Sequence, residues 1–228
     1  MTDDAFGGHD KLSLRQLPAG LAAFIHKARE SERPLAIVTM GSAPPQHASA
    51  VFMAALAACE KLGVSAVLLC SMKALPQGWA PSAHTHHEAY APFAALLHHA
   101  QVFLYNGGIG GFSQASRAGC PQLIVPVAFD QPHNAETAVR LGIGMRVDWQ
   151  GGACAEQEMT AAISRLLTSP AVRQRCDEVR VLSETDGESG CQRAARHVLD
   201  LAARIAARRC LDAAPAGAMT DEGGLSRA

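Results

Sequence analysis

Four of the five residues from 107 to 111 are glycine, in the stretch YNGGIGG that follows a short apolar run. Glycine lets backbone amides approach a ligand without interference from a Cβ atom, and it accepts backbone angles that other residues avoid. A helical pattern follows at residues 112–118, and the unpaired N–H groups of a first helical turn favour an anion such as phosphate. A tight structural turn between a strand and a helix has much the same sequence, so this loop alone leaves both interpretations open.

A second loop, TMGSAPP at residues 39–45, also follows an apolar run and precedes a helix expected to begin near Gln46. Its backbone amides and the Ser42 hydroxyl can reach the same phosphate if the two strands are neighbours. Alternatively, Ser42 is part of an N-terminal helix cap and Gly41 is a simple turn residue.

Two further groups suit the other parts of such a ligand. Tyr90 and Phe93 lie close to a proline, where an exposed ring can stack on a base, although aromatic residues are also common in protein cores. Asp130 and Gln131 follow the run QLIVPV, and a carboxylate beside a carboxamide can bind vicinal sugar hydroxyls. In isolation, this pair would instead be interpreted as a helix cap.

Almost continuous apolar runs alternate with amphipathic stretches along the chain. We expect strands at residues 35–40, 66–70, 86–90, 102–105, 122–127 and 145–149. We expect helices at residues 17–29, 48–62, 92–98, 112–118, 132–141, 156–167, 171–182 and 191–209. This alternation predicts an α/β fold with a doubly wound, Rossmann-like parallel sheet covered by helices on both faces. Ligands of such sheets bind outside the carboxyl ends of the strands, where all four groups lie.

Composition and length limit the classes of function. The formal net charge is −1 and no cluster of basic residues is interleaved with aromatic ones, so nucleic-acid binding is not expected. Seven cysteines without a C-x-x-C motif indicate reduced thiols. The N-terminus lacks the features of a signal peptide, and no apolar run reaches the roughly 18 residues of a membrane span. We expect a cytoplasmic protein with one domain at residues 1–212 and a disordered tail at 213–228.

Together, TMGS, YAPFAALL and GGIGG.SQA..AG.PQLIVP.AFDQP.NA resemble the donor half of family 1 glycosyltransferases of the GT-B fold, and most of all the bacterial rhamnosyltransferase group involved in rhamnolipid synthesis. The resemblance implies a C-terminal GT-B-type domain that takes a UDP- or dTDP-sugar as substrate, with no metal and no cofactor. It implies Tyr90, Ala91 and Phe93 at the base, Gln114 at the ribose, Ser42, Asn106, Gly108, Gly110 and Gly111 at the diphosphate, and Asp130 with Gln131 at the sugar.

The sequence departs from this family at two positions of the glycine-rich loop. Asn106 stands where the family usually has histidine, and Gly111 stands where it usually has serine or threonine. Losing a side-chain hydrogen bond to a charged group typically costs about 1.5–3 kcal/mol, so we expect weakened donor binding. The helix N-terminus, which is the larger anion-binding feature, remains.

A sugar transfer also needs a general base, which the family places in an N-terminal acceptor domain. We therefore expect a separate N-terminal GT-B polypeptide as partner. Within the chain, His133 is the candidate base, although a histidine in a first helical turn is usually only solvated. A metal triad of His84, His86 and His87 is not expected. Consecutive residues of a strand point to opposite faces, so His87 points away from the face that His84 and His86 share.

Two functions of different classes follow. The first is the donor-binding half of a glycosyltransferase that transfers a hexose, with rhamnose as the candidate, to a lipid or small-molecule hydroxyl. The second is a non-catalytic nucleotide-sugar-binding remnant or a subunit of a split glycosyltransferase. An NAD-binding domain ranks third, because the loop lacks the third glycine of the dinucleotide motif. An Ala/Leu/Ile-rich stripe at residues 191–209 either docks a partner or packs on its own sheet.

Overall fold

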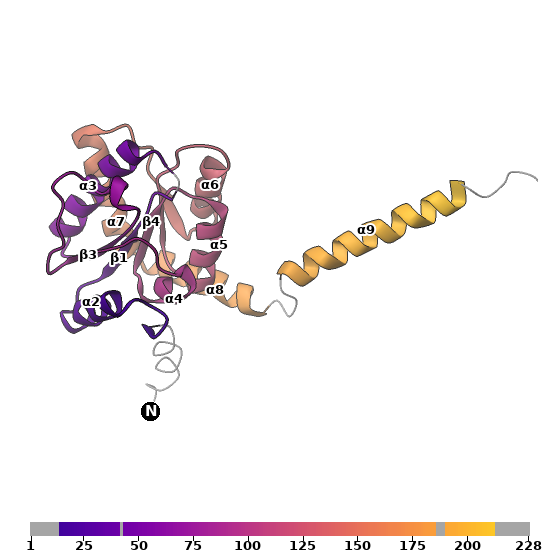
Figure 1. Cartoon of the computed structure of the whole chain (residues 1–228), viewed down its shortest axis with the longest axis horizontal. Helices are drawn as coiled ribbons and strands as arrows, with labels where there is room; N and C mark the ends of the chain where they lie inside the picture. Colours follow the sequence, from indigo (N-terminus) through magenta and orange to yellow (C-terminus); the bar gives the residue numbers. More distant parts are fainter. Residues whose placement is uncertain (1–13, 42, 186–189, 213–228) are drawn as a thin grey trace, which may run out of the picture. The chain divides into compact units, whose positions relative to one another are not determined.

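The computed structural model describes residues 14–41, 43–185 and 190–212. The chain divides into two units, with the boundary after Thr185. The first unit contains a six-stranded, entirely parallel sheet in the order β3-β2-β1-β4-β5-β6 (Figure 1). Its strands are β1 Leu35–Val38, β2 Ser65–Leu69, β3 Thr85–Glu88, β4 Val102–Tyr105, β5 Gln122–Ile124 and β6 Gly144–Arg146. The predicted α/β fold and its doubly wound sheet are confirmed.

The central strands are buried on both faces, which explains their almost continuous apolar sequence. Every residue of β1, β2, β4 and β5 is buried, whereas the edge strand β3 is half-buried throughout. Consecutive residues of a strand face opposite sides of the sheet, so neighbours in sequence pack in different cores. Val38 packs in one hydrophobic cluster, while Ile37 packs in the other.

Helices complete both cores. Alternate strand residues pack under α3 and α7 on one face, and under α2, α5 and α8 on the other (Figure 1). The helical segments are α2 Ala19–Glu30, α3 Pro45–Lys61, η1 Met72–Ala74, α4 Phe93–Leu96, η2 Leu97–His99, α5 Ile109–Ala118, α6 Gln131–Leu141, α7 Gly152–Thr168 and α8 Pro170–Thr185. Both faces of the sheet are therefore covered, as a parallel sheet requires.

The main difference from the sequence-based boundaries concerns α5. It begins at Ile109 rather than at Phe112, so Gly110 and Gly111 form its first turn instead of a preceding loop. Two consecutive glycines disfavour a helix interior, but they are tolerated in a first turn, where the backbone is only partly constrained. The helix ends on Gly119 in the left-handed conformation, with φ 65° and ψ 25°.

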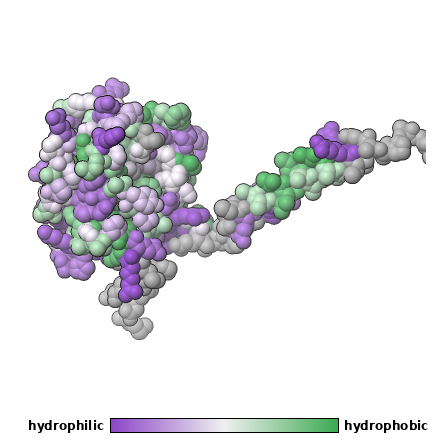
Figure 2. Space-filling view, in the orientation of Figure 1, coloured by the Kyte–Doolittle hydropathy of each residue, from purple (hydrophilic) through white to green (hydrophobic). Residues whose placement is uncertain are grey.

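The second unit contains the helix α9, Gly190–Asp212. Its exposed apolar residues are Val198, Leu199, Leu201 and Ile205, and hydrophobic surface gathers along this helix in Figure 2. The tail predicted at residues 213–228 lies outside the described residues. Among the helices that the structure describes, none has the length and apolar character needed to span a bilayer.

Candidate functional site

The carboxyl ends of β1 and β4 lie side by side at the position where the strand order reverses. Val38 is in register with Leu104, and the Thr39 N–H continues the ladder to the Leu104 carbonyl at 2.9 Å. The chain then turns at Gly41, which has φ 54°. Strand order reverses here because β2 and β3 lie on one side of β1 and the later strands lie on the other. In open α/β sheets, ligands bind outside the carboxyl ends of the strands at such a reversal.

The two loops touch through Asn106, whose side chain is 8% exposed. A Cβ atom on Gly41 would lie 3.1 Å from Asn106 Nδ2 and 3.5 Å from its Oδ1. Asn106 Oδ1 also accepts a hydrogen bond from the Gly108 N–H at 3.3 Å. The predicted convergence of the 39–45 and 106–111 loops is thus present in the structure, while Ser42 lies outside the described residues.

The N-terminus of α5 lies close to the carboxyl end of β4, at this reversal of strand order. Gly108 is the N-cap residue and no side chain caps the helix; the first intrahelical bond runs from the Phe112 N–H to the Gly108 carbonyl at 3.0 Å. The amides of Ile109, Gly110 and Gly111 therefore have no carbonyl in a preceding turn to which they can donate. Among the four glycines at residues 107–111, only Gly107 takes a positive φ, of 88°.

Gly110 and Gly111 differ in their surroundings. A Cβ atom on Gly110 would meet no other atom within 4 Å, so this position is open. Gly111 instead faces the ring of Tyr105. An anion can therefore approach the helix end over Gly110, whereas Gly111 belongs to the packing beneath the loop.

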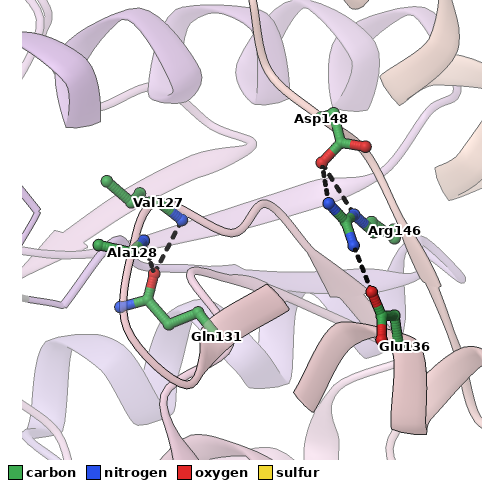
Figure 3. A network of polar contacts seen from close by, with 6 residues as sticks. All are labelled: Val127, Ala128, Gln131, Glu136, Arg146 and Asp148. Atoms are coloured by element: carbon green, nitrogen blue, oxygen red, sulfur yellow. Dashed lines mark hydrogen bonds and ion pairs between the residues drawn. The ribbon is translucent and has the colours of Figure 1, made fainter. Parts of the chain in front are cut away.

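Gln131, expected to bind the sugar, is 8% exposed and its oxygen is already engaged. Its Oε1 accepts hydrogen bonds from the Val127 N–H at 2.8 Å and the Ala128 N–H at 3.1 Å (Figure 3). The carboxamide oxygen therefore stabilises the loop between β5 and α6 by binding two of its backbone N–H groups. Asp130, its neighbour, is exposed and is the N-cap residue of α6.

Asn134 is a site residue that the sequence-based reasoning missed. Its Nδ2 donates to the Gly107 carbonyl and to Asp130 Oδ2, each at 2.8 Å. The side chain therefore joins the glycine-rich loop to the carboxylate that follows β5. The sequence offered two indications: Asn134 belongs to the FDQP.NA part of the family pattern, and residues four apart on a helix are neighbours.

The residues expected around the base have different environments. Tyr90 is 77% exposed, so its ring is available for stacking. Ala91 is buried, and Phe93 packs edge-to-face on Phe103 with 5.2 Å between the ring centroids. Gln114 is half-buried on α5. Tyr90 is thus the more exposed ring, whereas Phe93 is half-buried and packs against the hydrophobic core.

The two histidines of β3 have different partners. His86 Nε2 lies 3.0 Å from Glu88 Oε1 and its ring stacks on Phe24, whereas His87 Nε2 lies 2.9 Å from the Cys70 carbonyl. Among the described residues, no three histidine, cysteine or acidic side chains are grouped as a metal site would need. His133 is exposed in the first turn of α6.

Two large apolar side chains are exposed next to the candidate site residues, which the sequence-based reasoning also missed. Phe129, beside Asp130, is 95% exposed and has φ 58°, a value that bulky residues rarely adopt. Ile109 at the start of α5 is also exposed. The site therefore presents apolar surface next to its polar groups.

An ion-pair network fixes the opposite side of α6. Arg146 donates to Asp148 at 2.8 Å and to Glu136 at 3.3 Å (Figure 3). The hydrogen bond to Asp148 is the main reason why the pKa of the Arg146 guanidinium is raised. This network connects α6 to the end of β6 and to the segment that follows it.

A sequence profile of the family described as erythromycin biosynthesis protein CIII-like, C-terminal domain, matches residues 76–198, which span β3 to α9 and include both the glycine-rich loop and Asp130. The chain belongs to this family. The match covers the glycine-rich loop, the start of α5 and Asp130, and leaves out the loop after β1.

Named relatives of this CIII-like domain are glycosyltransferases. The chain is 28% identical over 153 residues to UDP-glucosyltransferase B1 of Starmerella bombicola, covering 66% of this chain and 35% of that protein. It is 34% identical over 119 residues to the vancomycin aglycone glucosyltransferase of Amycolatopsis orientalis, covering 52% and 26% respectively. The chain thus spans about a third or less of the length of these two relatives.

Solved structures agree with this assignment. The glycosyltransferase of kitacinnamycin superposes with a TM-score of 0.62 at 28% sequence identity, covering 73% of this chain and 42% of that one. The CIII-like domain therefore has the fold of one part of a longer glycosyltransferase.

Proposed function

We propose that this CIII-like domain is the donor-binding half of a glycosyltransferase. It binds a UDP- or dTDP-hexose, with rhamnose as the candidate sugar, for transfer to a lipid or small-molecule hydroxyl. The observation that carries the proposal is the contact between the β1 and β4 loops beside the uncapped end of α5, with Asp130 joined to the same loop through Asn134.

The diphosphate binds at the start of α5 beside Gly110, where a Cβ atom would meet no neighbour and where no side chain caps the N–H groups of the first turn. Residues 74–116 contain no lysine or arginine, so backbone N–H groups and the helix dipole supply the attraction from this part of the chain. Asn106 Nδ2 adds a neutral donor, and Ser42 contributes its hydroxyl to the same diphosphate.

The base and the sugar bind on either side of the diphosphate. The Tyr90 ring stacks on the base, the Ala91 backbone binds its edge, and Gln114 contacts the ribose. The Asp130 carboxylate accepts hydrogen bonds from the sugar hydroxyls. Gln131 acts mainly by holding the loop that presents Asp130, because its carboxamide oxygen is occupied.

The transfer itself forms a bond between the acceptor oxygen and the anomeric carbon, and breaks the bond from that carbon to the diphosphate. The acceptor proton passes to a base, and the electron pair leaves with the diphosphate, whose charge the α5 amides stabilise. We propose that a partner polypeptide, the N-terminal GT-B half, supplies this base and the acceptor site. His133 is the candidate within this chain.

The non-catalytic alternative is not favoured, because the named relatives are enzymes of sugar transfer. We propose that the domain works in the cytoplasm, with neither metal nor cofactor.

Calorimetric titration with UDP, dTDP, their sugar conjugates and NAD tests the proposal. We expect a nucleoside diphosphate to bind and NAD not to bind. Gly110→Leu is expected to abolish binding by filling the open space over the helix end. Ala171→Leu is the matched control, because Ala171 is also an exposed second residue of a helix, α8. A folded chain that binds none of these nucleotides would reject the proposed function.

A further inference from the structure

The N-terminus of α6 is joined to the glycine-rich loop by direct packing. Gly107 lies so close to its neighbours that a Cβ atom there would be 2.6 Å from Ile124 Cγ2 and 3.2 Å from the Gln131 carbonyl oxygen. The Gly107 backbone is therefore pressed against the residue that follows Asp130. The glycine-rich loop and the start of α6 are therefore in direct contact.

Asn134 adds a directed contact to this packing. A carboxamide nitrogen carries two hydrogens in one plane. Here one hydrogen is directed to the Gly107 carbonyl and the other to Asp130 Oδ2, both at 2.8 Å, and the Asn134 side chain is 7% exposed. Asn134 is thus shielded from solvent, while the Asp130 carboxylate that it holds is exposed.

This arrangement determines how the carboxylate is presented. With Oδ2 bonded to Asn134, Oδ1 is the oxygen left for a ligand. A bond to an ionised carboxylate is stronger than a neutral one, so it restricts rotation about the side-chain torsions of Asp130. The same nitrogen fixes the distance between this carboxylate and the loop at the diphosphate.

We propose that Asn134 is a positioning residue that makes the site select a nucleoside diphosphate carrying a sugar over the bare nucleoside diphosphate. The inference rests on the proposed function. Asn134 acts through Asp130 and not by touching the ligand. Its loss therefore acts mainly on the sugar-dependent part of the affinity, because the amides of α5 are in place without it.

The test compares dissociation constants for UDP and UDP-glucose, and for dTDP and dTDP-rhamnose, by calorimetry. Asn134→Ala is expected to weaken binding of the preferred sugar nucleotide about tenfold, the factor that corresponds to roughly 1.4 kcal/mol. Binding of the matching bare nucleotide is expected to change by less than about twofold. Asn134→Ser, which keeps a single donor, provides a second variant if the alanine variant does not fold.

Two controls separate positioning from general damage to α6. Glu136→Ala removes a polar contact from the same helix, on the side that faces Arg146, and is expected to leave the affinity ratio unchanged. In an Asp130→Ala background, Asn134→Ala is expected to have no further effect on the ratio, because residues that act in series are not additive.

The outcomes are distinct. The inference is supported if the Asn134 variants lower the ratio of the affinity for the sugar nucleotide to the affinity for the bare nucleotide. In the Asp130→Ala background, the same substitution should then leave this ratio unchanged. An equal loss of affinity for both ligands, which leaves the ratio unchanged, would overturn it. An unmodified chain that binds both ligands with equal affinity would also overturn it. An unmodified chain that binds neither ligand would reject the proposed function, and this inference with it.

Discussion

The ring of Tyr105 occupies the space where a side chain at position 111 would begin. A Cβ atom on Gly111 would lie 2.9 Å from both Cδ2 and Cε2 of Tyr105, and 3.3 Å from Phe103 Cε1. The ring cannot easily move, because it stacks on Phe103 at 4.3 Å and its hydroxyl donates to Gln122 Oε1 at 2.6 Å. The glycine that departs from the glycosyltransferase pattern is therefore a packing partner of Tyr105.

Gly111→Ser restores the hydroxyl of the family pattern. It is expected to lower the free energy of unfolding, because the new side chain has no room beside Tyr105. Overpacking of this kind typically costs about 1–3 kcal/mol of unfolding free energy. Urea unfolding measures the loss, and Gly110→Ala is the control, since its Cβ meets no neighbour. A serine variant as stable as the unmodified chain would contradict this packing.

Tyr105→Phe is expected to destabilise the fold by about 1–3 kcal/mol, because it leaves the buried Gln122 Oε1 without its donor. Gln122 Nε2 keeps its bond to Ser116 Oγ at 3.2 Å, so only one contact is removed. Thermal and urea unfolding measure the effect. Tyr90→Phe, at an exposed site, should be close to neutral, and equal losses in the two variants would refute the argument.

Alkaline titration tests the same environment. Burial, assisted by the nearby Cys120 thiol, raises the pKa of Tyr105 well above the ordinary tyrosine value of about 10. The folded state then keeps this proton when the unfolded state has lost it, so unfolding free energy falls as pH rises above about 10. Phenolate absorbance should show Tyr105 ionising only as the chain unfolds. Ionisation of both tyrosines of the chain with the fold intact would be inconsistent with this burial.

Substitutions of Tyr90 and Phe93 should have different effects, the first on nucleotide binding and the second on the free energy of unfolding. Tyr90→Ala is expected to weaken nucleotide binding by about 1–3 kcal/mol, the usual range for a base stacked on an aromatic ring, with little change in unfolding. Phe93→Ala should mainly lower the unfolding free energy, because this ring packs on Phe103. Calorimetry and urea unfolding on both variants check the assignment, and a Tyr90 variant with unchanged affinity would remove the ring from the site.

Thiol reactivity should follow burial. Burial raises the pKa of Cys59 and Cys176 to about 12 and that of the half-buried Cys70 to about 11, while Cys154 is exposed. The thiolate is the reactive form, so iodoacetamide at pH 8 should modify Cys154 well before these three. Mass spectrometry of peptides measures the order, with urea-unfolded protein as the control. Rapid labelling of Cys59 in the folded chain would argue against the core packing.

The sheet could be predicted from the sequence because its determinants are local. Apolar runs such as that before Asn106 specify buried parallel strands, and the rule for ligand sites then placed the glycine-rich loop and Asp130 at one edge. The start of α5 was placed three residues late, because Gly110 and Gly111 resemble a loop when only propensities are considered.

Side-chain partners could not be predicted in the same way. Gly111 was compared with the family pattern alone, and the ring that it accommodates lies on the preceding strand. Gln131 was assigned to the sugar from its type, while its oxygen binds backbone amides of its own loop. Contacts of this kind depend on rotamers and on the loop path, which periodicity does not specify.

No residue from 106 to 111 has an ionisable side chain. A histidine at the position of Asn106 would gain and lose a proton near neutral pH, and its hold on an anion would change with acidity. The amide of Asn106 keeps the same donors and acceptor in acidic and neutral surroundings alike. The charge of the side chains in this loop is therefore the same in acidic and in neutral surroundings.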